Sequence, residues 1–202
     1  MTPQGRTKSG DKKQVILQAA KDLFSQKGFK DTNVPEITAR AGIATGTFYL
    51  YFSSKEKLFM DLFLEENTKL KREIMDEINM DADPLEAIQQ LMYVNYKAMS
   101  SNPILKEWYN TEVFSKIEEK YREEQGLEQL DFLYDNYVEV IQKWQAEGKF
   151  RSDIDTDMIM ALFSVIINID VHKEEIGLKF FPKIQDLLTE FIIKGLTPQA
   201  KK

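Results

Sequence analysis

The segment TNVPEITARAGIATGTFYLYFSSKEKLF, residues 32–59, decides the fold of this chain. Asn33 followed by Glu36 has the spacing of a reciprocal helix N-cap, which predicts a helix start at this point. Gly42 stands where a left-handed residue ends a helix, and a second short helix begins at about Ala44. Two helix boundaries separated by so few residues predict a helix-turn-helix rather than ordinary bundle helices.

The second of these short helices is expected to present a defined face. Phe48 and Phe52 lie four residues apart and should both point inward. The opposite face carries Gly46, Thr47 and Leu50, although a glycine inside a helix costs about 1 kcal/mol relative to alanine. Such a face suits the DNA major groove, where apolar groups contact thymine methyls and hydroxyls bond to base edges. The alternative is that Leu50 packs on a neighbouring helix.

This run resembles the DNA-binding domain of TetR-family (tetracycline-repressor-type) transcriptional regulators. The matching elements are AGIATGTFYLYFSSKEKLF and, upstream, ILQAAKDLFSQKGF, so the resemblance covers roughly residues 11–64. Many members have His where this chain has Tyr51, and many have Ala or Asp-Ile-Ala where it has residues 36–38. Tyr51 can still donate a hydrogen bond to a phosphate. The resemblance implies DNA binding, and it implies that the two C-terminal helices form a homodimer.

Nine residues are predicted to contact DNA. The predicted base contacts come from the second short helix: Thr45, Gly46, Thr47, Tyr49 and Leu50. The predicted phosphate contacts flank it: Thr32, Asn33, Tyr51 and Lys55. Lys55 opens the next helix, whose N-terminal amides would hold a phosphate together with its ammonium group. The alternative for Lys55 is a solvated charge.

The charge of the chain is distributed unevenly. The net charge is −6, but residues 1–60 hold ten Lys and Arg against five Asp and Glu, which leaves −11 for residues 61–202. A basic head on an acidic body is expected when only one end of a protein meets phosphates. Residues 1–10 are predicted to be a flexible basic arm, and Arg6, Lys8, Lys12 and Lys13 could reach the DNA backbone or minor groove. The alternative is an ordinary solvated terminus.

Several function classes are excluded by composition. The chain has no cysteine, and its single histidine, His172, stands near a predicted helix end, so neither a metal cluster nor a cofactor is expected. Neighbouring carboxylates such as Glu118 and Glu119 point apart on a helix, unlike a catalytic pair. No run approaches the roughly 18 apolar residues of a membrane span, and the N-terminus is polar. We therefore expect a cytoplasmic protein that is not an enzyme and has no membrane partner.

The rest of the chain predicts an all-α fold. No strand alternation or internal repeat is present, and helices are expected over 11–27, 54–79, 84–101, 103–117, 125–147, 156–172 and 181–196. The predicted domains are a helix-turn-helix DNA-binding domain over 11–53 and a helical ligand-binding and dimerisation domain over 54–202.

The helical body is expected to hold a ligand pocket. Soft methionine and aromatic side chains with a few polar tips suit an adaptable, mainly apolar site. The candidates are Met92, Tyr96, Met99, Trp108, Tyr109, Phe114, Tyr137, Trp144 and Asn168. The alternative for each apolar candidate is a place in the core, because apolar stripes at helical spacing hold bundles together. Asn168 could instead bond across an interface.

The last two predicted helices carry apolar stripes suited to association. The predicted dimer residues are Met158, Leu162, Val165, Ile166, Ile169, Ile184, Leu187, Leu188 and Phe191. They could form a four-helix interface with a second copy, or they could cap the monomer core. A twofold protein would require a pseudo-palindromic DNA site with recognition helices roughly 34–36 Å apart, or more if spaced wider.

Together these features predict a homodimeric transcription regulator, most simply a repressor. It would bind a double-stranded DNA operator and be released by a small hydrophobic or amphipathic effector. Two rivals are a helical protein that sequesters a hydrophobic ligand without regulating DNA, and an interaction protein whose acidic body is the working surface. Replacing Thr47 and Tyr51 with Ala would separate them, because only the regulator would lose its function.

Overall fold

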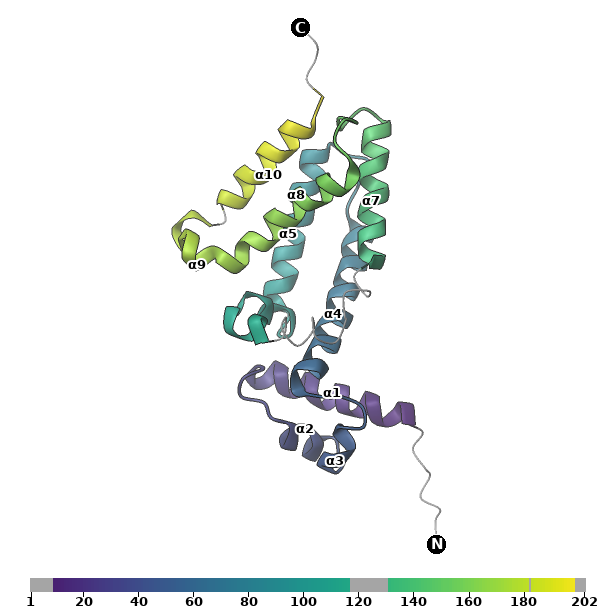
Figure 1. The fold of residues 1–202 in the computed structure, drawn as a ribbon, viewed down its shortest axis with the longest axis vertical. Coiled ribbons are helices and arrows are strands. Elements are labelled where there is room, and N and C mark those ends of the chain that lie inside the picture. Colours follow the sequence, from purple (N-terminus) through teal and green to yellow (C-terminus); the bar gives the residue numbers. More distant parts are fainter. Residues whose placement is uncertain (1–8, 117–130, 182, 199–202) are drawn as a thin grey trace. The chain divides into compact units, whose positions relative to one another are not determined.

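The computed structural model describes residues 9–116, 131–181 and 183–198, and its regular secondary structure in those ranges is helical (Figure 1). The α-helices are α1 (Ser9–Lys27), α2 (Val34–Arg40), α3 (Thr45–Phe48), α4 (Lys55–Glu77), α5 (Pro84–Ser101), α7 (Asp131–Ala146), α8 (Thr156–Asn168), α9 (Lys173–Ile176) and α10 (Lys183–Leu196). Short 3-10 helices are η1 (Leu105–Tyr109), η3 (Ile169–His172) and η4 (Leu178–Phe180). The predicted all-α class, an N-terminal helix-turn-helix followed by a helical region, is confirmed.

Two predicted helices are interrupted. The helix expected over 103–117 begins as the 3-10 helix η1, and Asn110 is extended before the chain becomes helical again at residue 111. The side chain of Asn102 accepts the N–H of Ile104 at 2.9 Å, which holds the start of this tight turn. The helix expected over 156–172 changes from α8 to η3 at Ile169. The first part of the helix expected over 125–147 lies outside the described residues.

The described residues divide into two compact units. The first unit takes them from Met1–Asn67 and Met99–Gly126, and the second from Thr68–Ala98 and Leu127–Lys202. The predicted domain boundary at residue 54 does not coincide with this division, because α4 and α5 each contribute to both units. Of the predicted arm, residues 9 and 10 begin α1 and the others lie outside the described residues.

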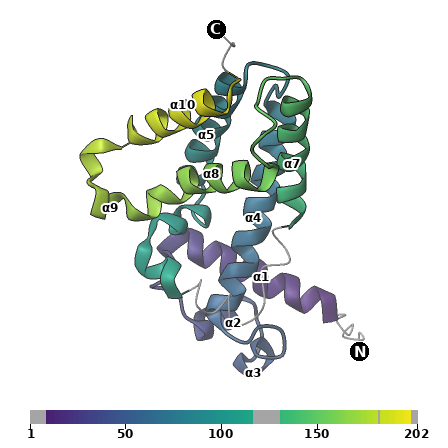
Figure 2. The same cartoon turned by 45° about the horizontal axis from the view of Figure 1, so that its top comes forward.

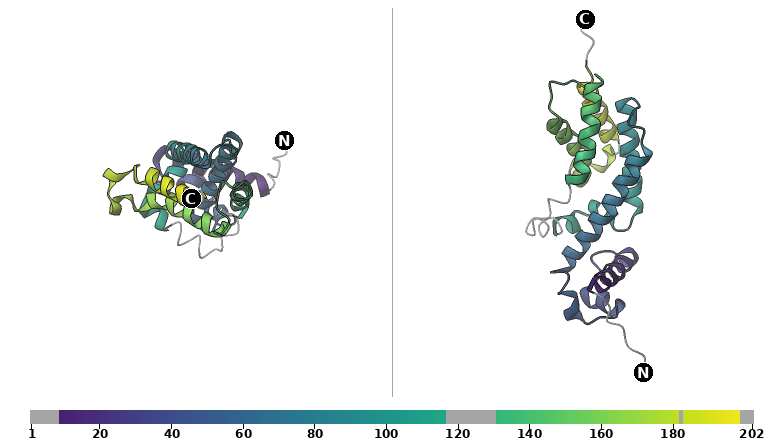
Figure 3. Two further views of the ribbon diagram at one scale, coloured as in Figure 1. Left: turned by 90° about the horizontal axis from the view of Figure 1, so that it is seen from above. Right: turned by 90° about the vertical axis from the view of Figure 1, so that its right-hand side faces the viewer.

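The core of the first unit is aromatic. Helices α1, α2 and α3 gather around the first turns of α4 (Figures 1 and 3). The Phe59 ring on α4 makes edge contacts with Phe24 and Phe29, at centroid distances of 5.2 and 4.9 Å. From the later segment, Trp108 of η1 stacks on Phe63 of α4 at 5.4 Å. The short helices of this unit therefore rest on a close-packed base.

In the second unit, α8 and α10 lie side by side and are joined through the short helix α9 (Figures 1 and 2). Helix α7 packs on α8, and its Trp144 is buried with an edge contact to Phe150 at 5.1 Å. The N–H of Arg151 donates to the carbonyl of Leu196 at 2.8 Å, which ties the end of α10 to the loop after α7. Within the described ranges, no helix combines the length and the apolar character needed to cross a membrane.

Candidate nucleic-acid interface and internal pocket

Helix α2 begins with the capping box that the spacing of Asn33 and Glu36 predicted. Asn33 Oδ1 accepts the N–H of Glu36 at 3.0 Å, and Glu36 Oε2 accepts the N–H of Asn33 at 3.1 Å, so both halves of the capping box form. Gly42 has φ +66°, the left-handed conformation that ends the helix. The N–H of Ile43 then donates to the carbonyl of Thr38 at 3.0 Å. This local bonding fixes the turn between α2 and α3.

Helix α3 is short, and the two residues that follow it, Tyr49 and Leu50, are much more exposed than the phenylalanines beside them. Phe48 is fully buried and Phe52 nearly so, as predicted, whereas Leu50 is 79% exposed and Tyr49 is 56% exposed. Because α3 ends at Phe48, Tyr49 and Leu50 lie in the turn that follows it rather than on the helix itself. The N–H of Leu50 still donates to the carbonyl of Thr47 at 3.2 Å, which continues the helical path. The unit thus projects an apolar side chain into solvent above a buried aromatic pair.

The remaining predicted base contacts belong to α3. Thr45 and Gly46 are exposed and Thr47 is half-buried. The hydroxyl of Thr45 shares a hydrogen bond of 3.2 Å with the hydroxyl of Thr38, which connects α3 to α2. A Cβ atom at Gly46 would meet no described atom within 4 Å, so packing among the described residues does not require glycine there.

Two side chains predicted to contact phosphates form hydrogen bonds to backbone carbonyls of the first unit. Thr32 is only 1% exposed, and its hydroxyl donates to the carbonyl of Gly28 at 2.8 Å. The ammonium group of Lys55 donates to the carbonyls of Phe29 and Thr32, each at 2.8 Å, and burial lowers its pKa. Because Thr32 is buried, the prediction that its side chain faces phosphates is corrected. Lys55 is half-buried and keeps a third N–H donor, so its phosphate contact stays a prediction. Asn33 is exposed and Tyr51 is half-buried.

Many basic side chains of the first unit pair with carboxylates. Lys27 contacts Glu36 at 2.6 Å, and this hydrogen bond is the main cause that lowers the pKa of Glu36. Further pairs join Arg40 to Asp22, Lys21 to Glu66, Lys30 to Glu112 and Lys57 to Asp61. The exposed Lys13 instead lies over the Phe52 ring, with Nζ 5.5 Å from its centroid. Lys12 and Lys13 are part of α1, whereas Arg6 and Lys8 lie outside the described residues.

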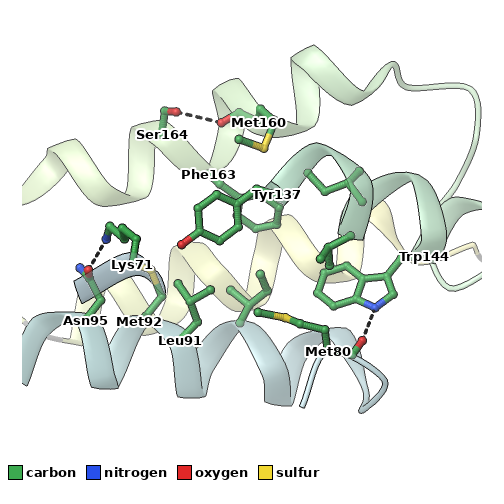
Figure 4. A pocket seen from close by; sticks show the side chains of 13 residues that line it. Lys71, Met80, Leu91, Met92, Asn95, Tyr137, Trp144, Met160, Phe163 and Ser164 are labelled. Carbon is green, nitrogen blue, oxygen red and sulfur yellow. Dashed lines mark hydrogen bonds between the residues drawn. The ribbon is translucent and has the colours of Figure 1, made fainter. Parts of the chain in front are cut away.

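A pocket opens within the second unit between α4, α5, α7 and α8 (Figure 4). It is lined by Lys71, Met80, Ile88, Leu91, Met92, Asn95, Tyr137, Val140, Ile141, Trp144, Met160, Phe163 and Ser164. Three of the predicted pocket residues, Met92, Tyr137 and Trp144, are in this lining. Sequence reasoning missed Lys71 and Asn95, which supply the polar groups at one end.

The other predicted pocket residues lie elsewhere. Tyr96 is 53% exposed on α5. Met99, Trp108, Tyr109 and Phe114 belong to the first unit, where Trp108 also makes an edge contact with Phe114 at 4.4 Å. They are not part of this pocket, whose lining belongs to the second unit. The side chain of Asn168 lies outside the described residues, so its predicted role stays a prediction.

The predicted dimer residues mostly face outward. Met158, Val165, Leu187 and Phe191 are exposed, at 53, 61, 38 and 60%. The half-buried members are Leu162, Ile169, Ile184 and Leu188. Ile166 is an exception, because it is 1% exposed and lies in the core of the second unit. On α8, therefore, Val165 and Ile166 point in opposite directions, and the prediction for Ile166 is corrected.

Known proteins similar to this chain include regulators with a helix-turn-helix. Residues 16–62 match the model described as "Bacterial regulatory proteins, tetR family". The HTH-type transcriptional repressor KstR2 of Mycobacterium tuberculosis is 27% identical over 152 residues, which is 71% of this chain and 72% of KstR2. Among solved structures, the fatty acid degradation regulator FadR from Bacillus halodurans is 23% identical and aligns with a TM-score of 0.59, covering 96% of this chain and 99% of that one.

A second solved structure of the same fold carries a ligand. The transcriptional regulator FadR from Bacillus subtilis in complex with stearoyl-CoA aligns with a TM-score of 0.59 at 18% identity, covering 93% of this chain and 99% of that one. Residues 16–62 thus match the DNA-binding domain of the TetR family of bacterial regulatory proteins, in agreement with the predicted resemblance. These matches identify the helix-turn-helix unit as that of a DNA-binding transcription regulator.

Proposed function

We propose that this regulator is a repressor that binds a pseudo-palindromic operator as a homodimer and is released by a small, mainly apolar effector. DNA binding is supported chiefly by the difference in exposure between neighbouring apolar side chains of one short segment. Phe48 and Phe52 are buried, whereas Leu50, between them in the chain, is the most exposed of the large apolar side chains named above at 79%. An apolar group held rigidly in solvent is suited to thymine methyls in the major groove. The proposed base contacts are Thr45, Gly46, Thr47, Tyr49 and Leu50.

Phosphate contacts would flank this reading segment. Asn33 is exposed at the start of α2, and the half-buried Tyr51 can offer its hydroxyl. Lys13 adds a cation that sequence reasoning assigned to a flexible arm, and its position over the Phe52 ring brings that charge close to the reading segment. Such contacts position the protein on the duplex, and base contacts supply the specificity.

The dimer part of the proposal rests on α8 and α10. Val165 and Phe191 are each about three-fifths exposed, at 61 and 60%, on helices that lie side by side. Large apolar side chains that gather on one surface favour burial against a second copy. Two copies would present two reading segments, and this arrangement requires an operator with twofold symmetry.

The effector part rests on the pocket of the second unit. Its apolar lining suits a small hydrophobic or amphipathic molecule, and KstR2, the relative described above, is named as a repressor. Release requires that the effector bind the DNA-free conformation more tightly than the DNA-bound one. An effector that binds equally to both conformations would leave operator affinity unchanged.

Selection of genomic duplexes bound by the purified chain tests the DNA-binding proposal. We expect the enriched fragments to share a pseudo-palindrome and to bind two chains each. The double variant Thr47→Ala and Tyr51→Ala should lose this enrichment while keeping its helical circular dichroism. If the double variant enriches the same fragments as the wild type, Thr47 and Tyr51 are not the DNA contacts. If the wild type itself enriches no common fragment, the chain is instead a ligand-sequestering or interaction protein that has kept the head.

Sedimentation of charged variants tests the dimer. Val165→Glu should convert the dimer to monomer, because a carboxylate in an apolar interface loses its hydration. Tyr93→Glu is a matched control, since Tyr93 is 65% exposed on α5, outside the proposed interface. Dimers of unchanged stability in Val165→Glu would exclude this face of α8 from the interface.

A further inference from the structure

The pocket of the second unit has one polar end and one apolar end (Figure 4). Lys71 and Asn95 lie at the polar end, and the hydroxyl of Tyr137 points toward them. At the opposite end the indole N–H of Trp144 donates to the carbonyl of Met80 at 2.9 Å. Between the two ends the lining is almost wholly aliphatic, aromatic or thioether. A ligand that fills this pocket would therefore be amphipathic along its length.

The polar end holds a cation, the ammonium group of Lys71. The Lys71 ammonium group has three N–H donors. Among the described residues it gives one hydrogen bond, to the neutral acceptor Asn95 Oδ1. Within the described part of the chain, no carboxylate forms an ion pair with Lys71. Besides Lys71, Tyr137 is the one titratable residue in the lining described above. Burial raises the pKa of Tyr137 to about 12, so its phenol stays neutral at pH 7.

Burial lowers the pKa of Lys71 to about 8, so at pH 7 roughly nine in ten molecules still carry the charge. A buried charge is strongly unfavourable unless it is paired and hydrogen-bonded. An anion would supply that pairing, and charge-assisted hydrogen bonds of this kind are about twice as strong as neutral ones. A cationic head would be repelled, and a neutral head would add no counter-charge to those that the described residues offer.

We propose that this pocket binds an amphiphile with one anionic head, the head paired with Lys71 and the apolar tail lying against Leu91, Met92 and Phe163. The inference rests on the proposed effector function of this pocket and names the chemical class of the effector. The Asn95 amide and the Tyr137 hydroxyl provide further donors for the head. The head can be a carboxylate or a phosphate, because both offer the same acceptor chemistry.

The size of the cavity sets the scale of the tail. Its volume is about 110 Å³, which is comparable with the roughly 150 Å³ cavity that admits benzene in another protein. A short alkyl chain or a single ring fits that space. Probes with eight-carbon chains are therefore suitable, because they combine a tail of this scale with heads of different charge.

Calorimetric titration of the full-length chain at pH 7 with octanoate, 1-octanol and octylamine tests the proposal. We expect octanoate to bind about tenfold or more tightly than octanol, and octylamine to bind most weakly. Lys71→Met keeps the apolar stem of the side chain and removes the charge, so octanoate should bind this variant no better than octanol does. Lys69→Met is the matched control, since the Lys69 side chain is 71% exposed two residues away on the same helix.

Two results would overturn the inference. One is equal affinity of the wild type for octanoate and octanol, and the other is unchanged octanoate affinity in Lys71→Met when Lys69→Met also binds normally. Octyl phosphate and octanoyl-CoA distinguish the sources of the head. Tighter binding of octyl phosphate that depends on Lys71 assigns a phosphate head, whereas selective binding of octanoyl-CoA that ignores Lys71 contradicts the site.

Operator affinity measured with the same probes keeps this inference distinct from the proposed function. If octanoate binds through Lys71 but leaves operator affinity unchanged, the anion site stands and release by an effector fails. If an uncharged ligand occupies the pocket and releases the operator while octanoate does not bind, the proposed function stands and the anion site fails.

Discussion

Leu50→Ala is expected to weaken operator binding while leaving the fold intact. Leu50 is 79% exposed, so its side chain contributes little to the core of the first unit. Exposed substitutions of this kind usually change the free energy of unfolding by no more than about 0.5 kcal/mol. Phe48, two residues earlier, is fully buried, and Phe48→Ala should destabilise the fold by about 3–5 kcal/mol. The two variants therefore distinguish a loss of operator affinity, expected for Leu50→Ala, from a loss of stability, expected for Phe48→Ala.

The size of the binding effect follows from the exposed area that Leu50 can bury on DNA. Burying a whole leucine side chain contributes about 1.5–3 kcal/mol, and a thymine methyl covers only part of it. We therefore expect Leu50→Ala to lose about 1–1.5 kcal/mol of binding free energy, which corresponds to roughly a 5- to 12-fold weaker Kd.

Fluorescence anisotropy with the selected operator at one fixed salt concentration measures this loss, and urea unfolding of the same preparation measures stability. Binding to a scrambled duplex provides the control, because a base-reading residue should affect it far less. Unchanged operator affinity in Leu50→Ala would refute the assignment of this turn to base contact. An equal loss on operator and scrambled DNA would indicate a role that carries no sequence information.

Three further outcomes concern the stability of the two units. Asn33→Ala removes one half of the capping box and should lower the free energy of unfolding by about 1 kcal/mol in urea titration, whereas the exposed Asp31→Ala should change it by less than about 0.5 kcal/mol. Trp144→Phe removes the hydrogen bond to the Met80 carbonyl and leaves space in the pocket wall, so a loss of at least about 1 kcal/mol is expected, and an unchanged urea midpoint would contradict that bond. Folding lowers the pKa of Lys71 from its usual value of 10.5 to about 8. Between pH 8 and pH 10.5 the unfolded chain therefore holds a proton that the folded chain has released. The free energy of unfolding of the wild type should accordingly rise with pH relative to that of Lys71→Met. A difference between these two proteins that stays constant from pH 7.5 to 10 would contradict a buried ammonium group.

Local signals predicted the helix-turn-helix because its bonds join residues close together in the chain. The capping box of Asn33 and Glu36 and the left-handed Gly42 act within a few residues of each other, so spacing alone specifies them. The inward direction of Phe48 and Phe52 follows from helical periodicity in the same way. Family resemblance over this segment then supplied the function.

Side-chain roles that depend on distant partners were not predictable. Lys55 bonds to carbonyls of Phe29 and Thr32, more than twenty residues away, and nothing in its own segment distinguishes that role from a phosphate contact. Trp108 and Phe114 are side chains typical of a ligand pocket, but in the first unit Trp108 stacks on Phe63 of α4 and Phe114 packs on Trp108. An apolar stripe indicates burial without indicating what covers it.

The pocket cation left a faint signal in the sequence. Lys71 stands between Leu70 and the apolar positions Ile74 and Ile78, and residues three and seven positions apart share a helix face. A lysine on the apolar side of a helix is unusual unless it is paired or functional. That position would have identified Lys71 as a candidate, although its partner Asn95 on α5 depends on the tertiary fold.

The most direct test of the central claim, sequence-specific DNA binding by the α2–α3 segment, is an affinity ratio. The purified chain is titrated onto the selected pseudo-palindrome and onto a scrambled duplex of equal length, each at several salt concentrations. We expect two chains to bind the operator about 10³-fold or more tightly than the scrambled duplex, with affinity that falls steeply as salt rises. Equal and weak binding to both duplexes would contradict that claim, because the basic head would then act only through its charge.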